Sequence, residues 1–219
     1  MYGLNILRGE LLLDREYPTW LNAIDTDRLS LGSTRSCVLA QIENDALGGD
    51  VDHYGLFSAA LERFGLWDND SDEEGASDGL DSPSRLGFDA HDPSPIWQER
   101  HPDDSVSSSS YIRLTDEWLT ALADRREPAN PDAVAYAYDA AVHHADCILH
   151  KLGALTAEEN AARKFSVEHA LTLLALDMGV DRSDYPDTER FPVPVRDAEL
   201  VNEDGTPQAC DTCLKAIES

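Results

Sequence analysis

The chain has 219 residues, of which 42% are hydrophobic, enough for one large or two small domains with a real core. Its 43 acidic and 17 basic residues give a net charge of −26, which disfavours direct binding to nucleic acid or anionic membranes and favours a partner with a basic surface. No apolar run approaches the ~20 residues of a membrane span, and a signal peptide pattern is missing, so we expect a cytoplasmic protein. The alternative is that the acidity only provides solubility or reflects the coding background.

The first part of the chain, residues 1–65, is predicted to be helical. Apolar residues recur there at helical spacing in four stretches, namely residues 4–14, residues 19–24, the stretch capped by Ser33 or Thr34, and residues 54–65. Tyr17-Pro18 separates the first two, because proline disfavours helical geometry in the residue before it.

Residues 66–110 lose this spacing and are predicted to form an acidic loop or linker, with four prolines and a serine run at 107–110. The stretch "DNDSDEEGASDGLDS" at 68–82 holds seven carboxylates and no base. A calcium loop, a solvated linker and an acidic partner-binding segment all remain open. The calcium template fits only in part, since Ser82-Pro83 denies it an exiting helix. The acids that we expect to bind a partner are Asp70, Asp72, Glu73, Glu74, Asp78 and Asp81.

The last part, residues 111–219, is also predicted to be helical. Helices are expected over "LTDEWLTALADRRE" after a Thr115 cap, over residues 131–153, and over residues 155–178 after a Thr156–Glu159 capping box. A tight connection predicts that the last two pack as an antiparallel helical hairpin, followed by an irregular tail with a short terminal helix. The expected fold class is therefore mainly α.

Four residues of this part predict a zinc site. On the expected helix 131–153, His143 and Cys147 lie four residues apart and share a face, which lets both reach one metal ion. Near the end of the chain, Cys210 and Cys213 form a C-x2-C pair. Together they would make a tetrahedral Cys3His site that fastens the C-terminus to the helix, a structural role more than a catalytic one. The alternative is that these are ordinary polar and thiol side chains without a metal.

The cysteines and histidines of this part also suggest two further kinds of site. A metal-dependent enzyme would use His143, Cys147 and His150, with Glu168 or His169 nearby. A thioredoxin-like redox pair at Cys210 and Cys213 is disfavoured, because no βαβ pattern precedes it. P-loop, dinucleotide and H-E-x-x-H motifs do not occur in the sequence. Whether the protein is an enzyme stays open, with a non-enzymatic protein favoured.

Several stretches resemble small acidic proteins encoded by actinobacterial viruses. These are "GELLLD", Trp20, "LSLGSTRSCVLAQ", "LGFDA" and "LTDEWLTALADRRE", which together span roughly residues 9–126. The chain departs from the pattern in the alanine of CVLAQ and in its long acidic insertion. The resemblance implies a small cytosolic protein outside the virion that acts on a host, and it carries no catalytic residues with it.

These observations together predict a non-enzymatic acidic protein that binds a basic surface of a host protein. The partner could itself be a nucleic-acid-binding protein, with the carboxylates imitating phosphates as a DNA mimic does, so that the chain inhibits or regulates it. The alternatives are a metal-dependent enzyme and a zinc-stapled structural or assembly protein.

Overall fold

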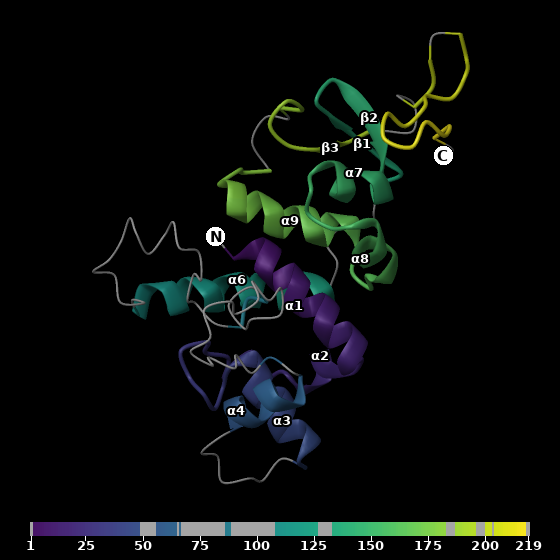
Figure 1. Ribbon diagram of the computed structural model, residues 1–219. Helices are drawn as coiled ribbons and strands as arrows, with labels where there is room; N and C mark the ends of the chain where they lie inside the picture. The colour runs from purple at the N-terminus through teal and green to yellow at the C-terminus, as the bar shows by residue number, and fades with distance from the viewer. Residues whose placement is uncertain are drawn as a thin grey trace, which may run out of the picture. The chain divides into compact units, whose positions relative to one another are not determined.

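The computed structural model describes residues 2–48, 56–64, 66, 86–88, 108–126, 133–182, 187–195, 200–202 and 204–217. These residues contain eight helices and one three-stranded antiparallel sheet, so the chain is mainly α (Figure 1). The chain divides into two compact units, Tyr2–Arg126 and Glu127–Ser219. The sequence predicts that the C-terminal part begins at residue 111. In the structure, the helix that ends at Arg126 belongs to the N-terminal unit, so the second unit begins at Glu127. No helix in the described part of the chain combines the length and apolarity needed to cross a bilayer.

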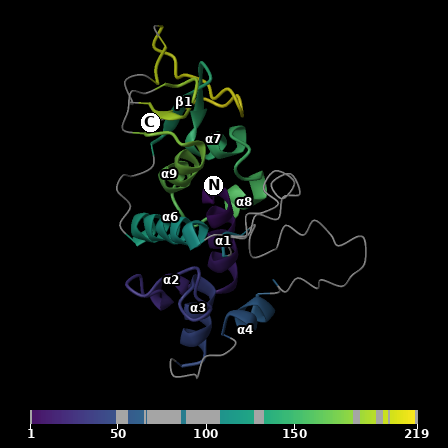
Figure 2. The ribbon, with the colours of Figure 1, turned by 90° about the vertical axis from the view of Figure 1, so that its left-hand side faces the viewer.

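The N-terminal unit is built from the helices α1 (Gly3–Glu16), α2 (Trp20–Ala23), α3 (Val38–Ala46), α4 (Leu56–Arg63) and α6 (Ser108–Arg126). The expected helices over residues 4–14, 19–24 and 54–65 are confirmed. In Figures 1 and 2, α3 and α4 lie side by side.

Two predicted helix starts in this unit are wrong. α3 begins at Val38, after a series of turns that includes Ser33 and Thr34, so neither residue caps it. α6 begins at Ser108 and contains Thr115 in its interior. The Thr115 hydroxyl donates to the carbonyl of Tyr111 at 2.8 Å, a bond to the preceding turn that competes with its use as a cap.

Two tryptophans form the centre of the N-terminal core, where α1 meets α6. Trp20 and Trp118 are both fully buried and pack edge to face, with ring centroids 6.2 Å apart. Phe88 stacks on Trp118 from the short segment 86–88, and the indole N–H of Trp118 donates to the carbonyl of Gly87. The segment is thereby fixed against α6.

A buried ion pair joins the ends of α1 and α6. The Asp14 carboxylate accepts a bond from the Arg125 guanidinium at 2.7 Å and another from the Trp20 indole at 2.9 Å. Both charged side chains are more than nine-tenths buried. Removing one partner of such a pair would leave an uncompensated buried charge and would destabilise the contact between α1 and α6.

Gly9 lets the 86–88 segment approach α1. A Cβ at Gly9 would collide with the carbonyl oxygen of Leu86, and Gly87 has φ +69°, in the left-handed region that favours glycine. Most of the stretches quoted for the resemblance meet here, since Gly9, Trp20, the 86–88 segment and Trp118 pack together. These stretches therefore occur in one sequence because their side chains pack against one another.

The C-terminal unit combines a small sheet with three helices. Its elements are β1 (Ala135–Tyr138), β2 (Ala141–His144), α7 (Ala145–Lys151), α8 (Ala157–Ala162), α9 (Val167–Met178) and β3 (Val193–Pro194), with strand order β2-β1-β3. In Figure 1, α7 lies between the sheet and α9. The final described stretches, residues 200–202 and 204–217, are called the C-terminal segment below. They form turns and isolated bridges beside β2, in place of the expected terminal helix.

The predicted long helix over residues 131–153 is wrong in its first part. Residues 135–144 form an antiparallel hairpin in which Tyr136 lies opposite His143. Asp139 and Ala140 make the two-residue turn with φ of 53° and 59°, the left-handed pair that matches the twist of the strands. Because such turns usually carry Asn-Gly or Asp-Gly, the Asp-Ala sequence did not signal a hairpin.

The predicted helix over residues 155–178 is also interrupted, which removes the antiparallel pair of long helices. The Thr156–Glu159 capping box is confirmed at the start of α8, and Gly179 ends α9 with φ +64°, as expected. Between the two helices Ser166 acts as a second cap, with its hydroxyl accepting a bond from the backbone N–H of His169. This local signal starts α9 in a new direction.

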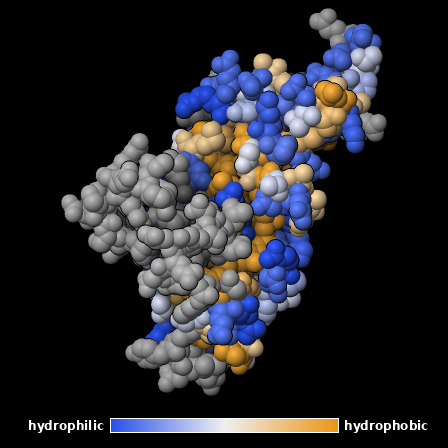
Figure 3. Space-filling model, in the orientation of Figure 1, coloured by the Kyte–Doolittle hydropathy of each residue, from blue (hydrophilic) through white to orange (hydrophobic). Residues whose placement is uncertain are grey.

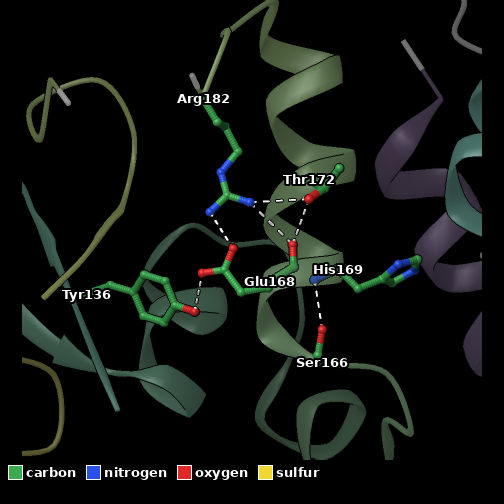
Figure 4. Close-up of polar contacts among 6 residues, drawn as sticks. All are labelled: Tyr136, Ser166, Glu168, His169, Thr172 and Arg182. Atoms are coloured by element: carbon green, nitrogen blue, oxygen red, sulfur yellow. Dashed lines mark hydrogen bonds and ion pairs between the residues drawn. The ribbon is translucent and has the colours of Figure 1, made fainter. Parts of the chain in front are cut away.

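Glu168 fastens α9 to the sheet. Figure 4 shows Tyr136 and Arg182 converging on its carboxylate, with the Tyr136 hydroxyl donating at 2.7 Å and Arg182 at 2.6 Å. The side chain of His169 points away to the other side of the helix (Figure 4). Both oxygens of Glu168 are therefore engaged in holding the fold together, which makes them poorly suited to proton transfer.

Candidate metal centre

Four side chains with metal-binding atoms gather in the C-terminal unit. The ligand atoms of His144, Cys147, Cys210 and Cys213 all lie within 4.8 Å of one another. His144 ends β2, Cys147 lies in the first turn of α7, and both other cysteines come from the C-terminal segment. All the cysteines are free thiols. Three sulfurs and one imidazole at this spacing are close enough to bind a single metal ion.

The histidine of this cluster is His144, and not His143 as the sequence predicts. The prediction assumes a helix, in which His143 would share a face with Cys147. In the hairpin, neighbouring residues of β2 point to opposite faces of the sheet, so only one of the two histidines faces the cysteines. His143 is fully buried and bonds instead to Thr212 at 2.9 Å and to the carbonyl of Tyr138 at 3.3 Å.

His144 is oriented for metal binding by the bonds of its two ring nitrogens. Nε2 lies 3.2 Å from the carbonyl oxygen of Ala216, which only accepts hydrogen bonds, so this nitrogen carries the proton. Nδ1 therefore keeps a free electron pair, and it lies 3.3 Å from the sulfur of Cys213. Metal-bound histidines commonly donate their other ring N–H to a carbonyl in this way.

Backbone hydrogen bonds hold the C-x2-C turn against the hairpin. The N–H of Leu214 donates to the carbonyl of Cys210 at 2.8 Å and closes the turn, while the N–H of Asp211 donates to the carbonyl of Val142 at 3.0 Å. Leu214 has φ 61°, a left-handed conformation that is uncommon for leucine. The sulfur of Cys210 accepts a bond from the backbone N–H of His144 at 3.4 Å. Both cysteines of the pair are thereby placed beside β2.

The protonation states of the thiols favour a cation at their centre. Burial, together with hydrogen bonds and repulsion from the Cys210 and Cys213 sulfurs, raises the pKa of the Cys147 thiol to about 12. Burial by itself would raise the pKa of Cys210, but N–H donors from His144, Cys213 and Thr212 outweigh it and lower that pKa to about 6. Without a cation, further ionisation beside a Cys210 thiolate is opposed, and a divalent metal ion removes this obstacle.

The other predicted site residues lie elsewhere. His150 is exposed near the end of α7, and neither it nor His169 belongs to the cluster. The predicted partner-binding acids Asp70, Asp72, Glu73, Glu74, Asp78 and Asp81 lie outside the described residues. The calcium interpretation of the stretch at 68–82 falls outside them as well.

Comparisons of this chain with family models, with curated proteins and with solved structures gave no match. The resemblance to proteins of actinobacterial viruses therefore stays a prediction.

Proposed function

We propose that the C-terminal unit is a zinc-stapled, non-enzymatic domain, in which a metal ion fastens the C-terminal segment to the hairpin and α7. The observation that carries the proposal is the closed set of four protein ligands, His144, Cys147, Cys210 and Cys213. Structural zinc sites have four protein ligands, whereas catalytic sites leave one position for water or substrate. Soft thiolates with one imidazole favour zinc over magnesium or calcium, which prefer oxygen.

The C-terminal segment needs such a staple because its own core is small. Its buried contacts centre on a cluster of four residues, Ala135, Leu200, Cys210 and Ile217, one of which is itself a ligand. The rest of the segment is mostly exposed. In Figure 3, apolar side chains also show at its surface, where Val201 and Leu214 are exposed. Metal binding supplies the folding free energy that so little buried area does not.

Metal substitution tests this proposal. The full chain, purified reduced and loaded with cobalt(II), is expected to give strong thiolate-to-metal absorption and the visible bands of tetrahedral coordination. His144→Ala should change the visible bands, whereas the matched variant His150→Ala, on an exposed histidine of the same region, should leave them unchanged. Chelation of the metal should lower the melting temperature of the C-terminal unit. A reduced wild-type chain that takes up no cobalt or zinc contradicts the proposal.

A metal-dependent enzyme at this place is less well supported. It would use His143, Cys147 and His150, and neither histidine belongs to the cluster. Glu168, the candidate acid or base, has both oxygens engaged by Tyr136 and Arg182. The observed contacts of these side chains therefore fit a structural metal site better than a catalytic one.

For the whole protein, we propose that the chain binds a basic surface on a host protein in the cytoplasm, as an inhibitor or regulator. Its support is the net charge of −26, which is densest at residues 66–104, with 12 acidic and 2 basic residues. A field of this sign speeds association with basic partners and repels nucleic acid itself.

A pull-down from host lysate tests this second proposal, with and without nuclease and with washes at rising salt. One stoichiometric basic partner should survive nuclease and moderate salt. Replacing the six acids at positions 70, 72, 73, 74, 78 and 81 by their amides should weaken its capture. The control for loss of charge alone compares amide replacement of Glu158, Glu189 and Asp204, in the C-terminal unit, with amide replacement of Glu73, Glu74 and Asp78. Equal, weak and salt-sensitive capture of every basic protein would refute the proposal.

A further inference from the structure

The three cysteine residues of the metal centre differ in their burial. Cys213 is exposed, Cys147 is half-buried and Cys210 is buried, although their sulfurs lie within 4.8 Å of one another. An oxidant that reaches the centre from solvent therefore meets Cys213 first. Oxidation of thiols follows thiolate character and exposure, and metal-bound cysteines are thiolates.

Of the other two cysteines, Cys210 lies closer to Cys213 along the chain and is the better placed to react with it once it is oxidised. Both lie in one tight turn, which the bond from the N–H of Leu214 to the carbonyl of Cys210 closes. Their sulfurs lie within 4.8 Å of each other, and a bond between them requires movement only inside this one loop of the C-terminal segment. A bond from Cys213 to Cys147 would instead have to pull against α7, whose backbone is fixed by its helical bonds and by its packing on α9.

We propose that Cys213 is an oxidation site, at which hydrogen peroxide joins Cys213 to Cys210 in a disulfide and releases the zinc ion. This rests on the proposed zinc staple. The Cys213 thiolate attacks one peroxide oxygen, the O–O bond breaks, and a sulfenic acid and hydroxide form. The Cys210 thiolate then attacks the Cys213 sulfur, the S–S bond forms, and the sulfenic oxygen leaves as a second hydroxide. The sulfurs lose two electrons, and the two hydroxides take up protons to become water.

Loss of two ligands opens the staple. His144 and Cys147 remain on the hairpin and α7, and two ligands do not retain zinc as a closed set of four does. The C-terminal segment then keeps only the small buried cluster around Leu200 and Ile217 and a few hydrogen bonds to the hairpin. Oxidation therefore detaches a segment that carries the exposed apolar side chains of Val201 and Leu214. The staple becomes a switch that responds to peroxide and is reset by a thiol reductant and zinc.

Peroxide treatment of the zinc-loaded full chain tests the inference. A chromogenic zinc chelator should report one zinc ion released for each disulfide formed. Mass spectrometry of the tryptic peptide 197–215, which holds both cysteines, should show the loss of two hydrogens. A thiol reductant with added zinc should restore the metal-bound form. A chain that holds no zinc at the start refutes the staple itself, whereas zinc that stays bound under peroxide refutes only the switch.

Two ligand-preserving variants sharpen the test. Cys213→His keeps four ligands but removes the exposed thiol, so zinc release should slow by about tenfold or more. His150→Ala is the control, because this exposed histidine of α7 lies outside the ligand cluster, and it should release zinc within about threefold of the wild-type rate. Equal rates in the two variants, or a disulfide between Cys147 and Cys213 in the wild type, would overturn the inference. If Cys213→His binds no zinc, the disulfide map of the wild type decides.

Discussion

The imidazole of His143 reaches the C-x2-C turn although it is not part of the ligand cluster. Its Nδ1 lies 2.9 Å from the hydroxyl of Thr212, which sits between the two cysteines of the pair. The ring is fully buried, and its other nitrogen meets the carbonyl of Tyr138. His143 is therefore a positioning residue, which holds the turn through Thr212.

Replacing His143 should weaken zinc binding without changing the ligands. We expect His143→Ala to lower zinc affinity by about 10–100-fold, as loss of groups that orient metal ligands commonly does. Competition with a chelator of known affinity measures this. The cobalt spectrum of the variant should keep the wild-type shape, whereas that of His144→Ala should not. The assignment of the two histidines would be reversed if His143→Ala changed the spectrum and His144→Ala did not.

The Cys210 thiol should make the stability of the metal-free protein depend on pH. Its pKa falls from an ordinary value of 9.0 to about 6 in the folded chain. Between these values the unfolded chain binds the proton and the folded chain does not, so the free energy of unfolding rises with pH. The stabilisation is fully present above pH 9 and is lost as the pH falls through 6.

Denaturant unfolding of the metal-free wild type and of Cys210→Ala, at several pH values, measures this effect. The difference in unfolding free energy between the two proteins should grow from pH 6 to pH 9. The high pKa of Cys147 does not disturb the comparison below about pH 8, because that thiol is still largely protonated in both states there. A difference that stays constant or shrinks over this range would contradict the assignment of a low pKa to Cys210.

At the scale of the elements, the β1–β2 turn decides which histidine faces the metal. Asp139 and Ala140 both adopt a left-handed conformation, which suits glycine far better than alanine. We expect Ala140→Gly to stabilise the C-terminal unit by about 1 kcal/mol. Ala137→Gly, in the interior of β1, should destabilise it, because a strand glycine loses more entropy on folding. Urea unfolding measures both, and a stabilising Ala137→Gly with a destabilising Ala140→Gly would show that the hairpin is misplaced.

The hairpin also explains why the sequence predicted the wrong histidine ligand. The stretch 135–144 is rich in alanine, a strong helix former, and its turn lacks asparagine and glycine. The only strand signal was the alternation of Tyr136, Tyr138 and later Val142 with small residues. Because this stretch was predicted to be a helix, the predicted histidine ligand was His143, whereas the structure places His144 in the cluster. Cys210 and Cys213 were found because their C-x2-C spacing does not depend on that prediction. Cys147 was found because it lies in α7, the part of the expected helix that does form.

The contact between α1 and the 86–88 segment gives a prediction in the N-terminal unit. Glycine to alanine inside a helix usually stabilises it, but a Cβ at Gly9 would collide with the carbonyl of Leu86. We expect Gly9→Ala to lower the melting temperature, at a cost of about 1–3 kcal/mol. The control is Gly32→Ala, whose Cβ would lie 3.4 Å from the nearest atom of Tyr111. A Gly9→Ala variant that is as stable as the wild type would show that the segment does not pack there.

At the scale of the whole molecule, the sequence predicted the mainly α fold class but not which helices pack together. Helical periodicity and caps identified α1, α4, α8 and the end of α9, because these signals are local. The grouping of α6 with α1 depends on distant contacts, such as those of Asp14 with Arg125, which spacing along the chain does not reveal. The closing of the metal site likewise depends on bringing residue 210 to residue 144.

Zinc K-edge X-ray absorption on the reduced full chain tests the central claim most directly. A centre made by His144, Cys147, Cys210 and Cys213 predicts one bound zinc ion with three sulfur neighbours at about 2.3 Å and one nitrogen at about 2.0 Å. Absence of zinc after loading would contradict the staple. A shell with two or fewer sulfurs, or with oxygen from water, would contradict the closed structural site.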